Sequence, residues 1–159
     1  MAGQIAGEID RIPIAEYSAE PAFPLDRTVA AFDTTMFRAS GLPIEGHRVI
    51  VVLETRPNSA VGASAWGPTA AGAPVLIVGE GERLDLPTTI QPVLVGTANH
   101  RRAWVRELID DTRRRHPSTV VVDMGWPGDD RQYADVATFG ASRHVGLALL
   151  DWLDAQAIA

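Results

Sequence analysis

Runs of consecutive apolar residues divide the chain, and β-branched side chains dominate them. Unbroken apolar runs of this length predict strands that are buried on both faces, as in a parallel sheet. The clearest run extends from Thr119 to Met124 and contains three successive valines. A shorter strand is expected from Asp135 to Phe139. Together, the predicted strands span residues 47–54, 75–78, 93–95, 119–124 and 135–139.

Between these runs, apolar residues recur at the spacing of a helix face. The first predicted helix spans residues 27–38, with Asp26 as its N-cap and Gly41 as its stop. Its apolar stripe consists of Leu25, Val29, Phe32 and Met36. Asn99 is expected to cap a second helix that ends near Arg115, where three arginines suit the helix dipole.

A third helix is predicted from a Ser142 cap to about Ala155. Residues 55–74 are rich in Gly, Ala, Ser and Pro, so they are expected to form a long loop. The alternation of strands and helices favours an α/β fold, a flavodoxin-like three-layer sandwich with a mostly parallel sheet. Residues 1–24 carry three prolines and no clean period, which indicates an N-terminal arm or linker, and residues 25–159 form the predicted domain.

Composition and charge exclude several classes of function. The 159 residues include no cysteine and no lysine, which excludes a thiol nucleophile, a thiolate metal site, Schiff-base chemistry and the lysine of a P-loop. A net charge of −6 disfavours a nucleic-acid partner or an anionic membrane surface. No apolar run approaches the roughly 20 residues of a membrane span. No signal peptide is visible, so a cytoplasmic location is favoured.

Ligands of open α/β sheets gather at the carboxyl ends of the strands. Four predicted loops lie there, at residues 56–66, 79–82, 97–101 and 125–131. These loops offer polar and aromatic residues as candidate ligand-binding groups, and Asp123 stands just before the last loop. The candidates are Asn58, Trp66, His100, Arg101, Asp123 and Trp126. A tryptophan on such a loop is suited to stacking on a sugar face, to anchoring a partner, or to packing.

Asp123 ends the clearest strand and offers two interpretations. As the nucleophile of a glycosidase it needs a second carboxyl about 5 Å away, and Asp129, Asp130 or Asp135 are the candidates. The commoner arrangement is a strand-terminal aspartate whose carboxylate accepts hydrogen bonds from loop amides. The sequence favours this structural role.

Other candidate groups have simpler structural interpretations. Ser142 follows Gly140 and superficially resembles a nucleophile elbow, but the second glycine of that motif is replaced by His144, so an N-cap is favoured. The four histidines have no metal-binding spacing, and neither a metal nor a cofactor is expected. His116, next to Pro117, is expected to be a solvated helix end, and His100 a capping residue at a strand–helix junction.

Two segments carry a resemblance to a known family. Residues 116–127, His-Pro-Ser-Thr-Val-Val-Val-Asp-Met-Gly-Trp-Pro, are followed by Val-Ala-Thr-Phe-Gly-Ala-Ser-Arg at 136–143. This pair resembles the C-terminal domain of glycoside hydrolase family 3, most closely the bacterial two-domain β-N-acetylhexosaminidase branch. Weaker likenesses are residues 58–62, Trp66-Gly67 and residues 93–115, and the resemblance covers residues 48–153.

The resemblance implies a domain without its own catalytic machinery. In that family the nucleophile and the acid/base pair lie largely in a separate (β/α)₈ barrel, which needs about 250 residues. The Lys-His-Phe-Pro-Gly-His-Gly signature of the hexosaminidase branch is absent from this chain. No catalytic residue of the family is therefore carried over. The segment between Trp66 and Val75 is short for the family, in which a further helix is expected.

The leading hypothesis is a non-catalytic accessory domain that supports a separate (β/α)₈ barrel or a homodimer, with the parent chemistry being hydrolysis of terminal β-linked N-acetylglucosamine. A first alternative is a standalone sugar-binding or regulatory module that takes an amino-sugar ligand through Trp66, Trp126, His100 and Arg101. A second alternative is a hydrolase with its own site near Asp123. Fold alone does not choose among the three.

Overall fold

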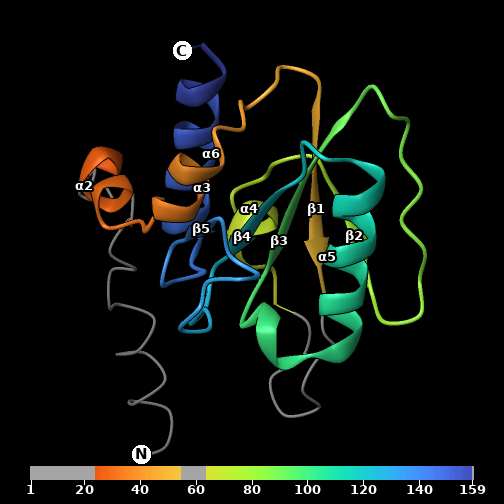
Figure 1. Ribbon diagram of the computed structural model, residues 1–159. Helices are drawn as coiled ribbons and strands as arrows, with labels where there is room; N and C mark the ends of the chain where they lie inside the picture. Colours follow the sequence, from red (N-terminus) through yellow and green to blue (C-terminus); the bar gives the residue numbers. More distant parts are fainter. Residues whose placement is uncertain (1–23, 55–63, 159) are drawn as a thin grey trace, which may run out of the picture.

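Five parallel strands form a single sheet in the order β2-β1-β3-β4-β5 (Figure 1). The structure is a computed structural model and describes residues 24–54 and 64–158. The strands are β1 (Arg48–Leu53), β2 (Val75–Val78), β3 (Gln91–Gly96), β4 (Val120–Asp123) and β5 (Val136–Ala137). This order is that of flavodoxin-like sheets, so the predicted α/β fold with its parallel sheet is confirmed.

The central strands are buried on both faces, as their unbroken apolar sequences predict. All six residues of β3 and all four residues of β4 are buried. In-register neighbours such as Ile50, Val93 and Val120 point to one face of the sheet, and Val51, Leu94 and Val121 point to the other. The β-branched runs therefore contribute side chains to the apolar layers on both faces of the sheet.

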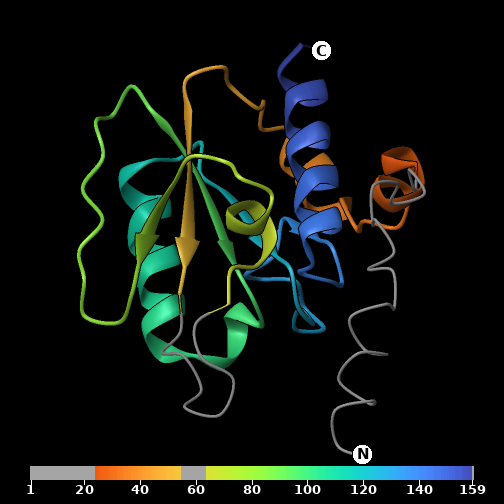
Figure 2. The same ribbon diagram turned by 180° about the vertical axis from the view of Figure 1, so that it is seen from behind.

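Helices cover both faces of the sheet and complete three layers (Figures 1 and 2). One face is covered by three helices, α3 (Thr35–Ser40), α4 (Gly67–Ala70) and α6 (Arg143–Ile158), and α2 (Leu25–Ala30) packs against α6. Its packing includes an edge-to-face contact of 5.1 Å between Phe37 and Trp152. The other face is covered by α5 (Ala103–Arg115) together with Leu84 from the segment after β2.

The single helix predicted over residues 27–38 is wrong, because the chain is divided into α2 and α3. Between them, Asp33 makes an isolated antiparallel bridge with Ala137, and each residue donates its N–H to the other's carbonyl at 2.9 Å. The apolar residues keep their helical spacing across Asp33, but the bridge with β5 forces the backbone to be extended there. The predicted stop at Gly41 is confirmed, with φ at +67°.

Three further boundaries differ from prediction. Asn99 does not cap a long helix, because residues Asn99–Arg101 form a short 3₁₀ helix (η1) and α5 starts at Ala103. Within the predicted loop at 55–74, residues 55–63 lie outside the described ranges and the remainder contains α4. The strand predicted at 135–139 is reduced to the two residues of β5.

His116 is buried, not solvated, with 5% of its surface exposed. Its carbonyl accepts hydrogen bonds from the N–H and the hydroxyl of Thr119, at 3.0 and 2.6 Å. This tight turn leads directly into β4 and holds the histidine against the interior. By contrast, the capping role of Ser142 is confirmed, since its hydroxyl accepts from the Val145 N–H at 3.2 Å.

The packing of α4 on α6 depends on two glycines. Gly146 of α6 lies so close to α4 that an added Cβ would be 2.2 Å from the Gly67 carbonyl oxygen. Gly67 itself has φ at +51° and donates its N–H to the Ala141 carbonyl at 2.8 Å. In the described part of the chain, no helix has the length and apolar character needed to cross a membrane.

Candidate functional site

The loops that follow β3, β4 and β5 meet at the carboxyl edge of the sheet, and Asp123 joins two of them. Its carboxylate accepts hydrogen bonds from the N–H groups of Ala98 and Asn99, both at 2.9 Å, and from Gly125 at 2.8 Å. The residue is 1% exposed. Among the described residues, each hydrogen bond to this carboxylate comes from a backbone amide, which is the structural role favoured by the sequence.

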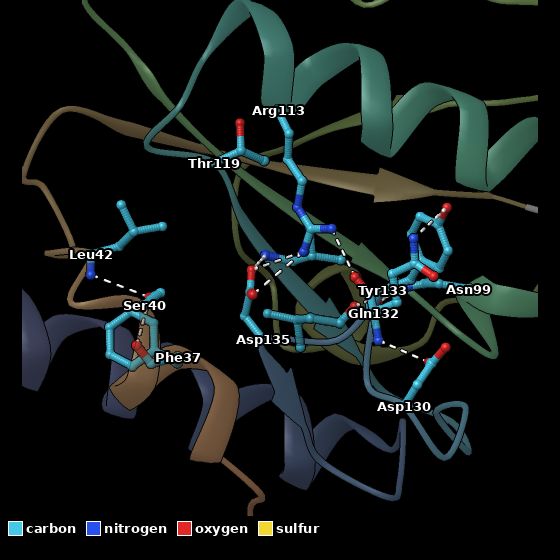
Figure 3. Close-up of polar contacts among 12 residues, drawn as sticks. Phe37, Ser40, Leu42, Asn99, Arg113, Thr119, Asp130, Gln132, Tyr133 and Asp135 are labelled. Atoms are coloured by element: carbon cyan, nitrogen blue, oxygen red, sulfur yellow. Dashed lines mark hydrogen bonds and ion pairs between the residues drawn. The ribbon is translucent and has the colours of Figure 1, made fainter.

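Two of the three acids considered as partners for Asp123, namely Asp135 and Asp130, have other contacts, and the third, Asp129, is exposed. Asp135 precedes β5, whereas Asp123 ends the neighbouring strand β4, so the two residues lie toward opposite ends of the strand pair. The Asp135 carboxylate accepts from the Val121 N–H at 2.8 Å and pairs with Arg113 at 3.4 Å, as Figure 3 shows for the arginine that extends from α5. Asp130 accepts from the Gln132 N–H at 3.0 Å, within its own loop.

Asn99 is a structural residue of this edge that the sequence did not reveal. It is 1% exposed, and its side-chain amide donates to the carbonyls of Val122 at 3.2 Å and Tyr133 at 3.1 Å. Figure 3 shows Asn99 beside Tyr133. The asparagine therefore connects the loop after β3 with β4 and with the loop after β4. Its side-chain oxygen lies against Gly96, where an added Cβ would be only 2.1 Å away.

Two aromatic side chains stand exposed at the same edge. Trp126, in the loop after β4, is 67% exposed, and Phe139, directly after β5, is 42% exposed. Their rings meet edge to face, with centroids 5.7 Å apart at an interplanar angle of 61°. The guanidinium carbon of Arg131 lies 5.9 Å from the centre of the Phe139 ring. We call these three residues the aromatic platform.

The platform rests on strained backbone. Among the described residues other than glycine, only three have positive φ: Ala98 at 49°, Arg131 at 54° and Phe139 at 55°. They lie in the loops after β3, β4 and β5 respectively. Such conformations cost about 1–3 kcal/mol each and persist only where the surroundings enforce them. For a bulky residue such as phenylalanine, a positive φ is a clear outlier.

Polar contacts fix the position of Arg131 within the platform. Its Nε donates to the Asp33 carboxylate at 3.1 Å, and one terminal nitrogen donates to the Gly128 carbonyl at 2.8 Å. Hydrogen bonds from Thr35, together with that from Arg131, lower the pKa of Asp33 below its usual value. The carboxylate thus stays ionised near neutral pH and orients the guanidinium against Phe139.

His100 and Arg101 lie beside this site. His100 borders a hollow of about 390 Å³ together with Arg106, Gly128, Asp129, Asp130, Gln132 and Tyr133. Its ring packs on Gly128, where an added Cβ would be 3.2 Å from the imidazole, and its carbonyl accepts from Arg106 at 2.6 Å. Burial, followed by the hydrogen bond to Asp110, raises the pKa of Tyr133. Arg101 is exposed.

The sequence-predicted ligand residues therefore divide into three groups. His100, Arg101, Asp123 and Trp126 come from the carboxyl ends of neighbouring strands, as predicted. Trp66, at the start of α4, is half-buried and packs against the hydrophobic core. Asn58 lies outside the described residues. Phe139 and Arg131 were missed, because no local sequence rule marks a phenylalanine or an arginine for positive φ.

The site carries no metal-binding constellation. In residues 24–54 and 64–158, no group of three or more His, Asp or Glu side chains is placed to hold an ion. Comparisons with family models, curated proteins and solved structures each found no match to this chain. The resemblance to family-3 glycoside hydrolases stays a prediction from the residues that carry it.

Proposed function

We propose that this chain is a non-catalytic accessory domain, like the C-terminal domain of family-3 β-N-acetylglucosaminidases, and that it binds an amino sugar on the aromatic platform. The observation that carries the proposal is the exposed, strained pairing of Trp126 with Phe139 at the carboxyl edge. The amide-bound carboxylate of Asp123 supports the non-catalytic part, because both of its oxygens already accept hydrogen bonds.

The chemistry of the platform suits a saccharide. The π face of an indole is electron-rich and attracts the polarised C–H groups on the flat side of a pyranose ring. The edge-to-face contact with Phe139 fixes the plane of the indole before binding, which lowers the entropic cost of association. Exposed Asp129, on the same loop as Trp126, and exposed Arg101, after β3, are hydrogen-bonding groups that suit sugar hydroxyls and an acetamido group.

Titration tests the binding role. We expect N-acetylglucosamine oligomers to bind the full chain in isothermal calorimetry and to perturb tryptophan fluorescence. Replacing Trp126 with alanine removes an exposed side chain and is expected to weaken binding by about 2 kcal/mol, or roughly thirtyfold. The matched control is Ile158→Ala, which also removes an exposed apolar side chain but lies on α6. Equal binding by both variants, or no heat with the parent chain, contradicts the proposal.

Enzyme assays test the non-catalytic role separately. We expect no hydrolysis of a chromogenic N-acetylglucosaminide by the isolated chain. Turnover that survives repurification and disappears in Asp123→Asn, with the circular dichroism spectrum unchanged, would establish the hydrolase alternative instead. A separate (β/α)₈ barrel as partner stays a prediction of the resemblance.

A further inference from the structure

Strand β2 forms one edge of the sheet and has solvent-exposed apolar side chains on both faces of the sheet. Leu76 is 43% exposed and Ile77 is 50% exposed. Because Leu76 pairs with Val51 and Ile77 pairs with Val52, the former lies on the α5 face and the latter on the α6 face. In the part of the chain that the structure describes, only β1 is paired with β2. Exposed apolar edges of this kind are sites of strand pairing.

The hydrogen-bonding pattern identifies which backbone groups are open. The Val78 carbonyl accepts from the Glu54 N–H at 2.9 Å, so Val78 directs its polar groups toward β1. Successive residues of a strand alternate in direction, so Val75 and Ile77 direct theirs outward. Gly79 follows the same alternation, but its N–H already donates to the Glu82 carboxylate at 3.0 Å. The open stretch of edge therefore ends at Ile77.

We propose that two copies of this chain associate through antiparallel pairing of their β2 strands, centred on Leu76. In this register Val75 of one copy lies opposite Ile77 of the other, and the two residues exchange both of their backbone hydrogen bonds. Two-fold symmetry repeats that pair, so each outward group of β2 up to the Gly79 cap finds a partner. The sheet then continues from one copy into the next.

The side chains favour a second copy as the occupant. On the α5 face the two Leu76 side chains meet, and on the α6 face Ile77 meets Val75 of the other copy, so both exposed apolar residues are covered together. β2 contains no charged residue. The acids that follow it, Glu80 and Glu82, fall at opposite ends of the shared ladder, so two chains of net charge −6 do not bring these carboxylates together.

The alternative centre at Ile77 is disfavoured. That register places Gly79 opposite Val75 and requires the Gly79 N–H to leave the Glu82 carboxylate. The Leu76-centred pairing leaves this cap intact. It also involves the opposite edge of the sheet from β5, so the dimer and the saccharide site are independent, and the failure of one does not affect the other.

Cysteine cross-linking tests both the dimer and its register, because the chain contains no cysteine of its own. In the proposed register the two residues at position 76 form a non-hydrogen-bonded pair with Cα atoms about 4.5 Å apart, within the range of a disulfide. Residues at position 77 are diagonal neighbours, about 7–8 Å apart, beyond that range. We expect Leu76→Cys to give a disulfide-linked dimer under mild oxidation, and Ile77→Cys, the matched control, to give no disulfide cross-link.

Sedimentation velocity gives the second readout. Ile77→Pro removes an N–H that points away from β1, so it blocks the dimer while the internal ladder is kept. We expect the parent chain and Ile77→Val to sediment as dimers at high concentration, and Ile77→Pro as a monomer with an unchanged circular dichroism spectrum. A parent chain that stays monomeric overturns the proposal, as does cross-linking at position 77 in place of position 76.

Discussion

The two edges of the sheet use their backbone in opposite ways. At the β5 edge, the extended residue between α2 and α3 bridges Ala137, and the Phe37 N–H donates to the Asp135 carbonyl at 3.1 Å. At the β2 edge, Val75 and Ile77 direct their polar groups outward. The difference bears on strain: of the three described non-glycine residues with positive φ, Arg131 and Phe139 lie in the loops on either side of β5, and none lies in β2.

The largest expected effect concerns the carboxylate that joins the loops. Asp123→Ala leaves three backbone N–H groups without their acceptor, and each uncompensated group costs about 1–3 kcal/mol. We expect a loss of about 4 kcal/mol in the free energy of unfolding, measured by urea denaturation. The exposed Asp129→Ala variant serves as the control and should change stability by less than about 0.5 kcal/mol. Equal losses in the two variants contradict the structural role of Asp123.

The next effect tests the backbone strain at Phe139, one of the platform residues. Phe139→Gly and Phe139→Ala both remove the ring contact with Trp126, but only glycine adopts a φ of 55° without steric cost. We expect the glycine variant to be more stable than the alanine variant by about 1 kcal/mol in urea denaturation. In ordinary extended backbone a glycine variant is less stable than the alanine variant. If Phe139→Ala is the more stable protein, the strained geometry at position 139 is falsified.

Much of the fold follows from local pattern, but the break between α2 and α3 does not. The valine-rich runs predicted the strands because both faces of a parallel sheet demand apolar side chains, and the helical period predicted α5 and α6. The break between α2 and α3 was missed because it depends on Ala137, a residue far along the chain. Local periodicity carries no information about such a contact.

The site was predictable to a similar extent. The rule of carboxyl ends placed Trp126 and Asp123 at the right edge, and a strand-terminal aspartate held by loop amides was the favoured interpretation. Phe139 was assigned to a strand, because its sequence context is apolar and its positive φ arises from the turn into α6. The buried Asn99 was assigned to a cap, whereas its amide group binds carbonyls of β4 and the following loop.

A smaller, pH-dependent effect distinguishes the β5 edge from the β2 edge. The pKa of Asp33 is lower in the folded chain, so its ionised form adds stability above its usual pKa, and this contribution is lost as the pH falls through the folded value. We expect the parent to exceed Asp33→Asn by about 0.5 kcal/mol near pH 6, since the pair with Arg131 is part-exposed. The difference should shrink as the pH falls below about 4, the ordinary pKa of an aspartate. A difference that grows on acidification contradicts this sign.

The smallest effect is expected at β2, and its dependence on concentration is informative. Ile77→Thr keeps a β-branched side chain at a half-exposed position, so the isolated fold should lose less than about 0.5 kcal/mol. A dimer stabilises the folded chain by mass action, so the melting temperature of the parent should rise with protein concentration while that of Ile77→Thr rises less. Ile77→Val, which keeps the apolar surface, should follow the parent. If all three chains melt independently of concentration, the β2 edge is as closed as the β5 edge, and the contrast between the two edges is lost.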